Sequence, residues 1–300
     1  HPEIPLADMQ RLTCMLLECG ATIHEINTLR KHLSRFSGGS LVRAAFPATV
    51  LGLIVSDVVG DDLDVIASGP TVPDPSTFAD CLRVVEHYGL RWKMPQSIWA
   101  HIEGGLQGRT PETPKADEPA FGRVRNVLVA SVKQAWEAAA DEAARCGFVP
   151  RILTTAMSGE ARRTAEQLVA EARRAQAGLR PGDAPLCLLA GGETTVTIRG
   201  SGKGGRNQEM ALAATLELAD DRGIDLICVG TDGTDGPTDA AGGYAFSGDL
   251  ARLRAIGLHP KESLDANDSY PLLLKAGTLL RTGPTRTNVM DMAIMLVRPK

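Results

Sequence analysis

The feature that most constrains the fold of this sequence is an alternation of apolar and amphipathic segments that begins near residue 122. Short apolar runs typical of buried strands and segments with helical periodicity follow one another along the chain. Strands that alternate with helices build a mostly parallel sheet covered by helices. We expect strands at 126–131, 151–155, 186–190, 226–230 and 292–297, and helices at 132–146, 159–176 and 207–219.

One pair of expected strands lies too close in the sequence for a helical connection. Segment 194–199 follows segment 186–190 after only three residues and alternates polar and apolar side chains. A parallel neighbour needs a crossover of about a dozen residues or more. The two segments are therefore predicted to form an antiparallel hairpin, which makes the C-terminal sheet mixed.

The N-terminal part is less regular. Residues 49–57 have the composition of a buried strand, 58–77 form a long segment rich in Gly, Pro and Asp, and 78–88 have a helical pattern. Long loops in compact domains are often functional. Residues 104–122 contain many helix breakers, and we interpret them as a linker or a flexible surface excursion.

The first residues are expected to form one helix capped by Asp8. Its apolar positions recur at helical spacing: Leu12, Met15, Leu16 and Ile23. No strand precedes this helix and the chain begins with His1, so we expect that residue 1 is not the natural start. The predicted fold is α/β, with two three-layer α/β/α domains. These are a Rossmann-like parallel-sheet domain over 1–121, incomplete at its N-terminus, and a mixed-sheet domain over 122–300 that contains the last motifs.

Composition excludes several classes of partner. The net charge is −4, so nucleic acid and anionic membranes are not expected partners. The longest apolar stretch, 44–55, has twelve residues and contains Pro47, whereas a membrane-spanning helix needs about twenty. Six scattered cysteines without a CxxC pair indicate reduced thiols and a cytoplasmic protein.

Polar residues gather where three of the expected strands end. Segments 56–62, 191–194 and 230–236 each combine carboxylates with glycines. Ligands of open α/β sheets bind beyond the carboxyl ends of the strands. Carboxylates there can hold Mg²⁺ or accept a hydroxyl proton, and glycines let backbone N–H groups approach an anion. Each segment alone is equally consistent with a polar turn.

The segment 200–209 (GSGKGGRNQE) is the strongest local signal. It lies between a predicted strand and a predicted helix, and its backbone donors, Lys203 and Arg206 favour a bound phosphate. It is not a Walker A loop, because no Ser or Thr follows Lys203. It matches GxGxxG, but of the two candidates for the ribose-binding acid of a dinucleotide site, Asp225 has the distance but starts its strand, and Asp232 has the position but is further away.

Other polar groups give weaker signals. The loop 66–74 either buttresses a site rigidly or binds substrate through Ser68 and Thr71. Arg30, Lys31 and Arg35 are interpreted as a solvated helix face, with binding of a carboxylate substrate by one of them as the alternative. No G-x-S-x-G motif and no plausible pairing of His with Ser or Cys occurs, which argues against acyl transfer.

Taken together, the motifs resemble the glycerate 2-kinases, the family whose C-terminal part is called the MOFRL domain. The resemblance covers nearly the whole chain, in the order of the family. It is carried by 20–39 (GATI…N…RKHLS…GG), 56–61 (SDV…GD), 66–74 (IASGPT…PD), 191–196 (GGETTV), 204–209 (GGRNQE), 230–238 (GTDG…DGPT) and 282–285 (TGPT).

This resemblance implies transfer of the γ-phosphoryl group of ATP to the 2-hydroxyl of D-glycerate, which gives 2-phosphoglycerate, with Mg²⁺ as cofactor. It implies D-glycerate and a nucleotide as partners and a site in the cleft between the domains; a homodimer stays open. Two features depart from the family. A further N-terminal segment with a Gly-Lys motif is not in this sequence, and Arg286 and Met290 replace a small and a polar residue.

The resemblance and the strand-end clusters together give a set of expected site residues. The catalytic roles fall to Asp57, with Asp61 as alternative base or Mg²⁺ ligand, and to Arg206. We expect substrate or phosphate binding by Ser56, Ser68, Thr71, Lys203, Gly205, Asn207, Glu193, Thr287 and Asn288; nucleotide binding by Gly191, Gly192, Gly230, Thr231, Gly233 and Gly236; and metal binding by Asp232 and Asp235.

Two other functions are consistent with the same residues. An NAD(P)-dependent hydroxypyruvate reductase would bind nicotinamide at 200–205, and some members of the family carry that label. A folded but inactive remnant would bind glycerate or nucleotide without turnover.

Overall fold

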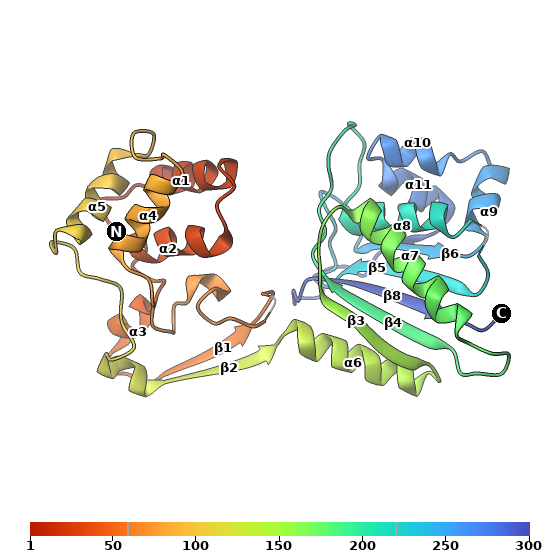
Figure 1. Ribbon diagram of the computed structural model, residues 1–300, viewed down its shortest axis with the longest axis horizontal. Coiled ribbons are helices and arrows are strands. Elements are labelled where there is room, and N and C mark those ends of the chain that lie inside the picture. The colour runs from red at the N-terminus through yellow and green to blue at the C-terminus, as the bar shows by residue number, and fades with distance from the viewer. Residues whose placement is uncertain (59, 220) are drawn as a thin grey trace. The chain divides into compact units, whose positions relative to one another are not determined.

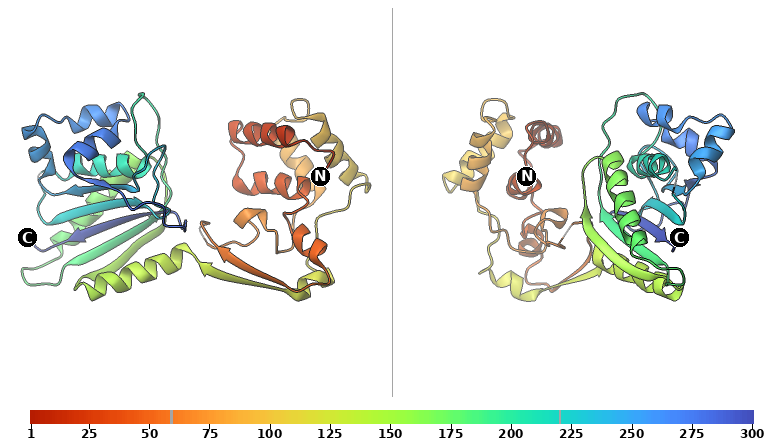
Figure 2. Two further views of the ribbon diagram at one scale, coloured as in Figure 1. Left: turned by 180° about the vertical axis from the view of Figure 1, so that it is seen from behind. Right: turned by 45° about the vertical axis from the view of Figure 1, so that its right-hand side comes forward.

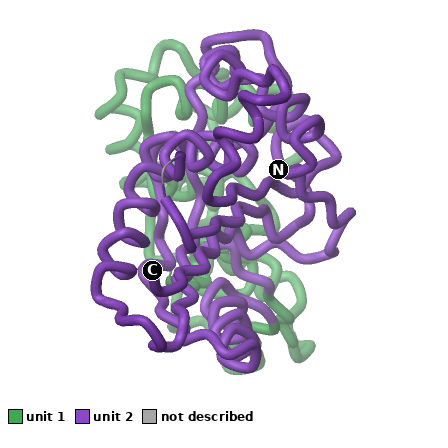
Figure 3. Tube along the Cα trace, turned by 90° about the vertical axis from the view of Figure 1, so that its right-hand side faces the viewer, with its two compact units in different colours: residues 1–54, 60–129 green, residues 55–59, 130–300 purple. Residues whose placement is uncertain are grey.

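The computed structural model describes residues 1–58, 60–219 and 221–300. The chain divides into two compact units, coloured separately in Figure 3. Unit 1 comprises His1–Ile54 and Gly60–Val129, and unit 2 comprises Val55–Val59 and Ala130–Lys300. We had expected a division at 121/122. No helix in the described part of the chain is long and apolar enough to cross a membrane.

Unit 1 is a cluster of helices with a small sheet. Strands β1 and β2 pair in a two-stranded sheet, and their arrows run the same way in Figure 1. The core lies among α1, α2, α4 and α5, around Leu16, Leu29, Val85 and Ile98. The elements are α1 (Leu6–Glu18), α2 (Ile23–Leu33), α3 (Ser40–Ala45), β1 (Val50–Val55), a 3₁₀ turn (Ile66–Ser68), α4 (Phe78–His87), α5 (Gln96–Leu106), a second 3₁₀ turn (Pro119–Arg123) and β2 (Val124–Ala130).

The single N-terminal helix that we predicted is two helices. Gly20, with φ +78°, stands in the break, a backbone conformation that glycine adopts without strain. Thr22 then starts α2 through a capping box with Glu25. Asp8 is not a cap; it lies in the first turn of α1 and accepts a hydrogen bond of 2.5 Å from Ser97 Oγ.

Residues 104–122 are not a linker between the units. The first three finish α5, and the remainder folds back inside unit 1, where Arg43 Nη1 donates to the Glu112 carbonyl at 3.0 Å. Residues 126–131 likewise do not belong to the C-terminal sheet, because most of them form β2 and pair with β1.

The solvated cationic face that we expected on α2 includes a buried lysine. Lys31 is 4% exposed, and its Nζ lies 2.9 Å from Asp64 and 3.4 Å from Asp74. The Asp74 side chain is fully buried. A buried ammonium is tolerated only when carboxylates compensate the lost hydration, and these acids come from a loop far along the sequence.

Unit 2 has a six-stranded mixed sheet in the order β3-β4-β8-β5-β6-β7. Strand β3 pairs parallel with β4, whereas β8 runs antiparallel between β4 and β5. The strands are β3 (Val149–Met157), β4 (Leu186–Gly192), β5 (Ile224–Gly230), β6 (Gly242–Phe246), β7 (Leu279–Leu280) and β8 (Asp291–Val297). The helices are α6 (Val132–Arg145), α7 (Ala161–Ala177), α8 (Arg206–Glu217), α9 (Asp249–Ala255), α10 (Pro260–Asp265) and α11 (Ser269–Ala276).

The predicted mixed sheet is confirmed, but the predicted hairpin is wrong. Residues 194–199 form no strand; Thr195 makes one isolated bridge with Glu160. The Glu160 carboxylate accepts from Thr197 N at 3.0 Å, and Asn267 Oδ1 accepts from Arg199 N at 2.7 Å. These distant side chains take the hydrogen bonds that a hairpin would have used, and β8 fills the place beside β4.

Helices cover both faces of this sheet, which gives three layers (Figures 1 and 2). Helices α7 and α8 pack on one face against the apolar side chains of β4 and β5, including Leu188 and Leu226. Helix α6 packs on the other face against Cys187 and Leu189. Strand β4 is consequently buried along its whole length, as expected for a strand inside a layered α/β domain.

The burial of Lys31 gives a test of the fold. We expect Lys31→Ala to lower the free energy of unfolding by about 3–5 kcal/mol, because it leaves the carboxylate of Asp74 buried without its cation. The matched control is Arg35→Ala, which removes an exposed cation nearby and is expected to change stability by less than about 0.5 kcal/mol. Urea denaturation measures both. Equal stability of the two variants would contradict the buried ion pair.

Candidate functional site

The candidate site lies at one edge of the sheet of unit 2, where β4 and β5 end and the antiparallel β8 begins. Asp291, the first residue of β8, stands opposite Gly192 of β4 on one side and opposite Gly230 of β5 on the other. The two glycine-containing segments that we singled out therefore flank one buried acid. Asp291 is 1% exposed.

Arg206, the first residue of α8, binds this acid through two parallel hydrogen bonds. Its Nε lies 2.5 Å from Asp291 Oδ2 and its Nη2 lies 2.9 Å from Oδ1, while Nη1 lies 3.4 Å from Glu193 Oε1. The hydrogen bonds to Asp291 raise the pKa of Arg206, so the guanidinium stays charged. Such a bidentate pair fixes the plane of the guanidinium as well as its charge.

Asp235 caps the start of α8. Its two carboxylate oxygens accept from the backbone N–H of Asn207 at 3.0 Å and of Gln208 at 2.8 Å, and Gln208 Nε2 adds a third bond at 2.9 Å. Burial raises the pKa of Asp235, and these hydrogen bonds oppose that rise. An added Cβ at Gly205 would lie 2.4 Å from Asp235 Cγ, so only glycine fits beside the cap.

This cap alters two of our expectations. The N-terminal donors of α8, which we predicted for a phosphate, already bind a carboxylate of the protein itself. Asp235 is 2% exposed and its carboxylate accepts four hydrogen bonds, two from Asn207 and two from Gln208, so its environment does not suit a metal ligand. Asn207 is fully buried and its Nδ2 also donates to Asp235, which makes it part of the scaffold.

The loop after β5 is bonded to the loop before β8. Thr285 N donates to the Asp232 carbonyl at 3.1 Å, and Val289 N donates to Thr231 Oγ1 at 2.9 Å. The Asp232 carboxylate accepts from Thr234 N at 2.8 Å. A Cβ placed on Gly230 would lie 3.2 Å from Asp232 Oδ1 and 3.6 Å from Asp291 Oδ1, so the two acids flank this glycine.

The remaining expected residues near this edge are placed as follows. Thr287 and Asn288 are exposed in the loop before β8, where Asn288 Oδ1 accepts from Met290 N. Arg286 is exposed with φ +65°, and Met290 is buried against Val132 and Trp136.

The glycines assigned to nucleotide binding have structural roles as well. A Cβ on Gly191 would lie 1.4 Å from Trp136 Cζ2, so the buried indole excludes any side chain there. A Cβ added to Gly192, Gly233 or Gly236 would likewise lie within 2.4 Å of a backbone oxygen of another residue. Close packing is therefore sufficient to explain why these positions are glycine.

Lys203 faces an aromatic ring. Its Nζ lies 4.3 Å from the ring centroid of Tyr270, and its backbone N–H donates to Asp268 Oδ1 at 2.8 Å. Tyr270 OH in turn donates to Asp239. The side chain is exposed, so its charge lies at the surface of the Gly-rich loop.

A pocket of about 520 Å³ opens beside Arg206. Thr194 lines it, is 2% exposed, and its Oγ1 has no hydrogen-bond partner among the described residues. A buried hydroxyl without a partner costs free energy unless a ligand or water binds it. The pocket is lined by Glu193, Thr194, Thr195, Val196, Ile198, Gly202, Gly204, Gly205, Arg206, Glu209, Gly236, Pro237 and Asn267.

Two residues of this site were missed by sequence reasoning. Asp291 carries one local signal, an acid at the start of an otherwise apolar strand. Asn267 carries none. Its Nδ2 donates to Glu209 Oε2 at 2.9 Å, and its Oδ1 accepts from Arg199 N and Gly200 N, so it fixes the Gly-rich loop to α8.

The expected residues from the middle of the chain divide between the units. Ser56 and the exposed Asp57 belong to unit 2, and Ser56 N donates to the Ala130 carbonyl at 2.9 Å. Asp61, Ser68 and Thr71 belong to unit 1. There Ser68 Oγ donates to Asn27 Oδ1 at 2.8 Å, and Asp61 has a buried Oδ1 without a partner among the described residues.

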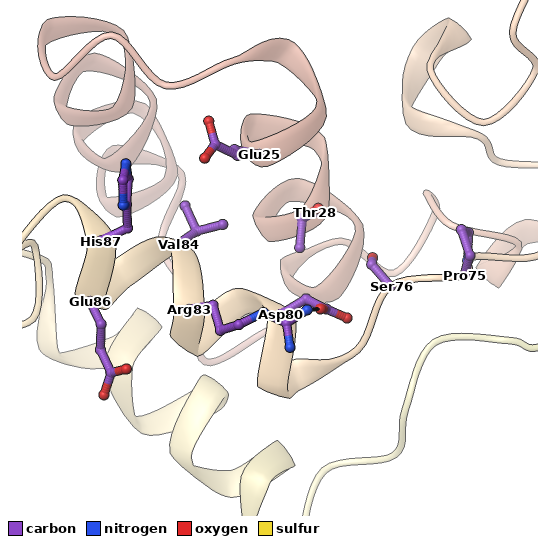
Figure 4. Close-up of a pocket in the computed structure, with 9 residues that line it drawn as sticks. All are labelled: Glu25, Thr28, Pro75, Ser76, Asp80, Arg83, Val84, Glu86 and His87. Carbon is purple, nitrogen blue, oxygen red and sulfur yellow. Dashed lines mark hydrogen bonds and ion pairs between the residues drawn. The ribbon is translucent and has the colours of Figure 1, made fainter.

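A different hollow, of about 880 Å³, lies between α2 and α4 of unit 1 (Figure 4). Two of its three acids, Glu25 and Asp80, already have partners within the protein. Glu25 accepts from Thr22 and Tyr88, and Asp80 accepts from Thr77. Nothing in this hollow resembles the convergent charges around Arg206.

Comparison with known proteins identifies the family. Residues 1–103 match a domain of unknown function (DUF4147), and residues 186–291 match the MOFRL family. The chain is 46% identical over 298 residues to "Glycerate 2-kinase" of Pyrococcus horikoshii, covering 99% of this chain and 67% of the relative. It is 44% identical to "Putative hydroxypyruvate reductase" of Agrobacterium vitis, covering 98% of this chain and 66% of that protein.

A solved structure agrees with these relatives. The crystal structure of glycerate kinase from Thermotoga maritima has a TM-score of 0.87 and 44% identity, and the match covers 99% of this chain and 68% of that one. The predicted family resemblance is confirmed over both units. This chain belongs to the glycerate kinase family.

Proposed function

We propose that this protein transfers the γ-phosphoryl group of ATP to the 2-hydroxyl of D-glycerate, with Mg²⁺. The observation that carries the proposal is the fixed guanidinium of Arg206, which lines one pocket together with Thr194, a residue with a buried, unpartnered hydroxyl among the described residues. Phosphoryl transfer depends on alignment and on stabilising charge that spreads over the phosphoryl oxygens. A preorganised cation and a free donor that line one pocket supply both.

The reaction is an in-line transfer of the γ-phosphoryl group to the substrate hydroxyl. The 2-hydroxyl oxygen of glycerate forms a bond to the γ-phosphorus, the bond from that phosphorus to the β–γ bridging oxygen breaks, and ADP leaves. The exposed carboxylate of Asp57 accepts the hydroxyl proton. Arg206 stabilises the charge on the transferring group or holds the glycerate carboxylate, and Thr194 donates a hydrogen bond to the same ligand.

The residues at the sheet edge fit a magnesium ion at Asp232. Mg²⁺ binds carboxylate oxygens and commonly uses one or two protein carboxylates together with phosphates and water. Asp232 is partly exposed beside Gly230, whereas Asp235 is committed to capping α8. When bound there, Mg²⁺ would neutralise charge on the nucleotide phosphates.

The reductase alternative has less support. A dinucleotide fingerprint needs a strand directly before its glycine loop, and residues 194–199 form none. Asp225, at the distance expected for the ribose-binding acid, lies in the first part of β5 and pairs with Arg298 at 2.7 Å. It therefore stands at the other end of the strand from the proposed site.

The direct test is formation of 2-phosphoglycerate from D-glycerate, ATP and Mg²⁺. We expect product, and we expect each substrate to raise the melting temperature by binding the native state. A rise in melting temperature without formation of 2-phosphoglycerate would instead identify a folded but inactive remnant that binds glycerate or nucleotide. Reduction of hydroxypyruvate by NADPH, with no phosphorylated product, would overturn the kinase proposal.

Arg206→Ala tests the central cation. We expect kcat/KM to fall by about 10²–10³-fold, the usual cost of removing one preorganised donor to the developing charge. The control is Arg298→Ala, which removes an arginine–aspartate pair at the opposite end of the sheet and leaves the rate unchanged. An unchanged rate in Arg206→Ala would remove Arg206 from the mechanism.

Thr194→Val tests whether the Thr194 hydroxyl binds the ligand or only stabilises the fold. Because Thr194 Oγ1 has no partner among the described residues, its removal is expected to leave the free energy of unfolding unchanged or raised. We expect kcat/KM to fall by about 2- to 10-fold, the value of one hydrogen bond. The matched control, Thr215→Val, removes a buried hydroxyl bonded to the Ala211 carbonyl, so stability should fall while the rate holds. The reverse pattern would contradict a ligand role for Thr194.

A further inference from the structure

Two histidines and a glutamate converge on the surface of unit 1, at residues that the kinase proposal does not use. His1 and Glu3 precede α1, and His101 lies on α5. One ligand atom from each of the three side chains lies within 4.8 Å of the other two. We propose that His1, Glu3 and His101 form a binding site for a divalent transition metal of the zinc type.

The hydrogen bonding of His101 supports this proposal. His101 is 5% exposed, and its Nε2 lies 3.0 Å from the His32 carbonyl oxygen. A carbonyl oxygen only accepts, so Nε2 carries a proton, and Nδ1 is the nitrogen left to bind a metal. Histidines that bind metals commonly donate their other N–H to a backbone carbonyl in this way, which fixes the tautomer and the ring.

Nδ1 of His101 faces the carboxylate of Glu3. This Nδ1 lies 3.3 Å from Glu3 Oε1, and His1 Nδ1 lies 3.6 Å from the same oxygen. Without a metal ion, a proton on each Nδ1 would make these contacts simple ion pairs, and a bound cation would take the place of those protons. Ligands placed about 2.0–2.1 Å from a tetrahedral Zn²⁺ ion are about 3.3–3.4 Å apart, close to both separations. A water molecule would complete the coordination.

Charge and ligand type favour zinc over magnesium here. Two imidazoles and one carboxylate suit Zn²⁺ and similar ions, whereas Mg²⁺ prefers oxygen ligands. The metal would join the segment before α1 to α5 and, through the His32 carbonyl, to α2. Its expected effect is therefore to stabilise unit 1.

The test is Zn²⁺ binding by the full chain, measured by calorimetry after chelator treatment with the cysteines kept reduced. We expect one equivalent to bind, and His1→Ala and Glu3→Gln each to weaken it at least about tenfold, since even outer-shell changes cost about 10–100-fold. The control is His24→Ala, which removes an exposed histidine on α2 and leaves binding unchanged.

Two further measurements decide between the metal and a simple ion pair. Co²⁺ in place of Zn²⁺ should give visible absorption without a thiolate charge-transfer band, which excludes the exposed Cys14 and Cys146 as ligands. Zn²⁺ should raise the melting temperature of the unmodified protein and of His24→Ala, but not of the two site variants. Binding that does not saturate at one equivalent, or that is equally tight in the site variants, would overturn the proposal.

Discussion

The candidate site depends on one buried ion pair, between Arg206 and Asp291. Asp291 has a backbone neighbour on each side, Gly192 and Gly230, so its position is fixed by the register of three strands. Its carboxylate is almost fully buried and would be costly there without a cation. Arg206 supplies that cation from the first turn of α8, and the same contact holds its guanidinium toward Glu193.

The placement of Arg206 requires a fixed start for α8, and Asp235 provides it. A carboxylate that accepts two N–H groups at a helix N-terminus is favoured both by hydrogen bonding and by the helix dipole. The cap also holds the Gly-rich loop, because Gly205 packs directly on Asp235. Asn267 and Glu209 hold the other end of that loop. The loop is therefore shaped by acids and amides of the protein before any ligand binds.

Unit 1 also contains buried charges that compensate one another. Lys31 lies inside the unit between Asp64 and Asp74, and His32 beside it contacts Glu112 through Nε2 at 2.6 Å. These contacts join α2 to the loop that carries Ser68 and Thr71. Charged groups that are buried and mutually compensated hold such a loop in one arrangement, because each alternative leaves a charge without its partner.

The sequence by itself determined the α/β class, the helices α4, α6, α7 and α8, the strands β1 to β5 and β8, and the family. It predicted a mixed C-terminal sheet from a hairpin that does not form, whereas the antiparallel strand is β8. Hydrophobic periodicity and the positions of glycines are local signals, and they place the end of β5 at Gly230 and the start of α8 within one residue of Arg206. Only the tertiary structure decided which polar groups meet. The pairing of Arg206 with Asp291, the capping by Asp235 and the burial of Lys31 each join residues at least 27 positions apart. Residues 194–199 lack a strand for the same reason, since the side chains of Glu160 and Asn267 take their backbone hydrogen bonds.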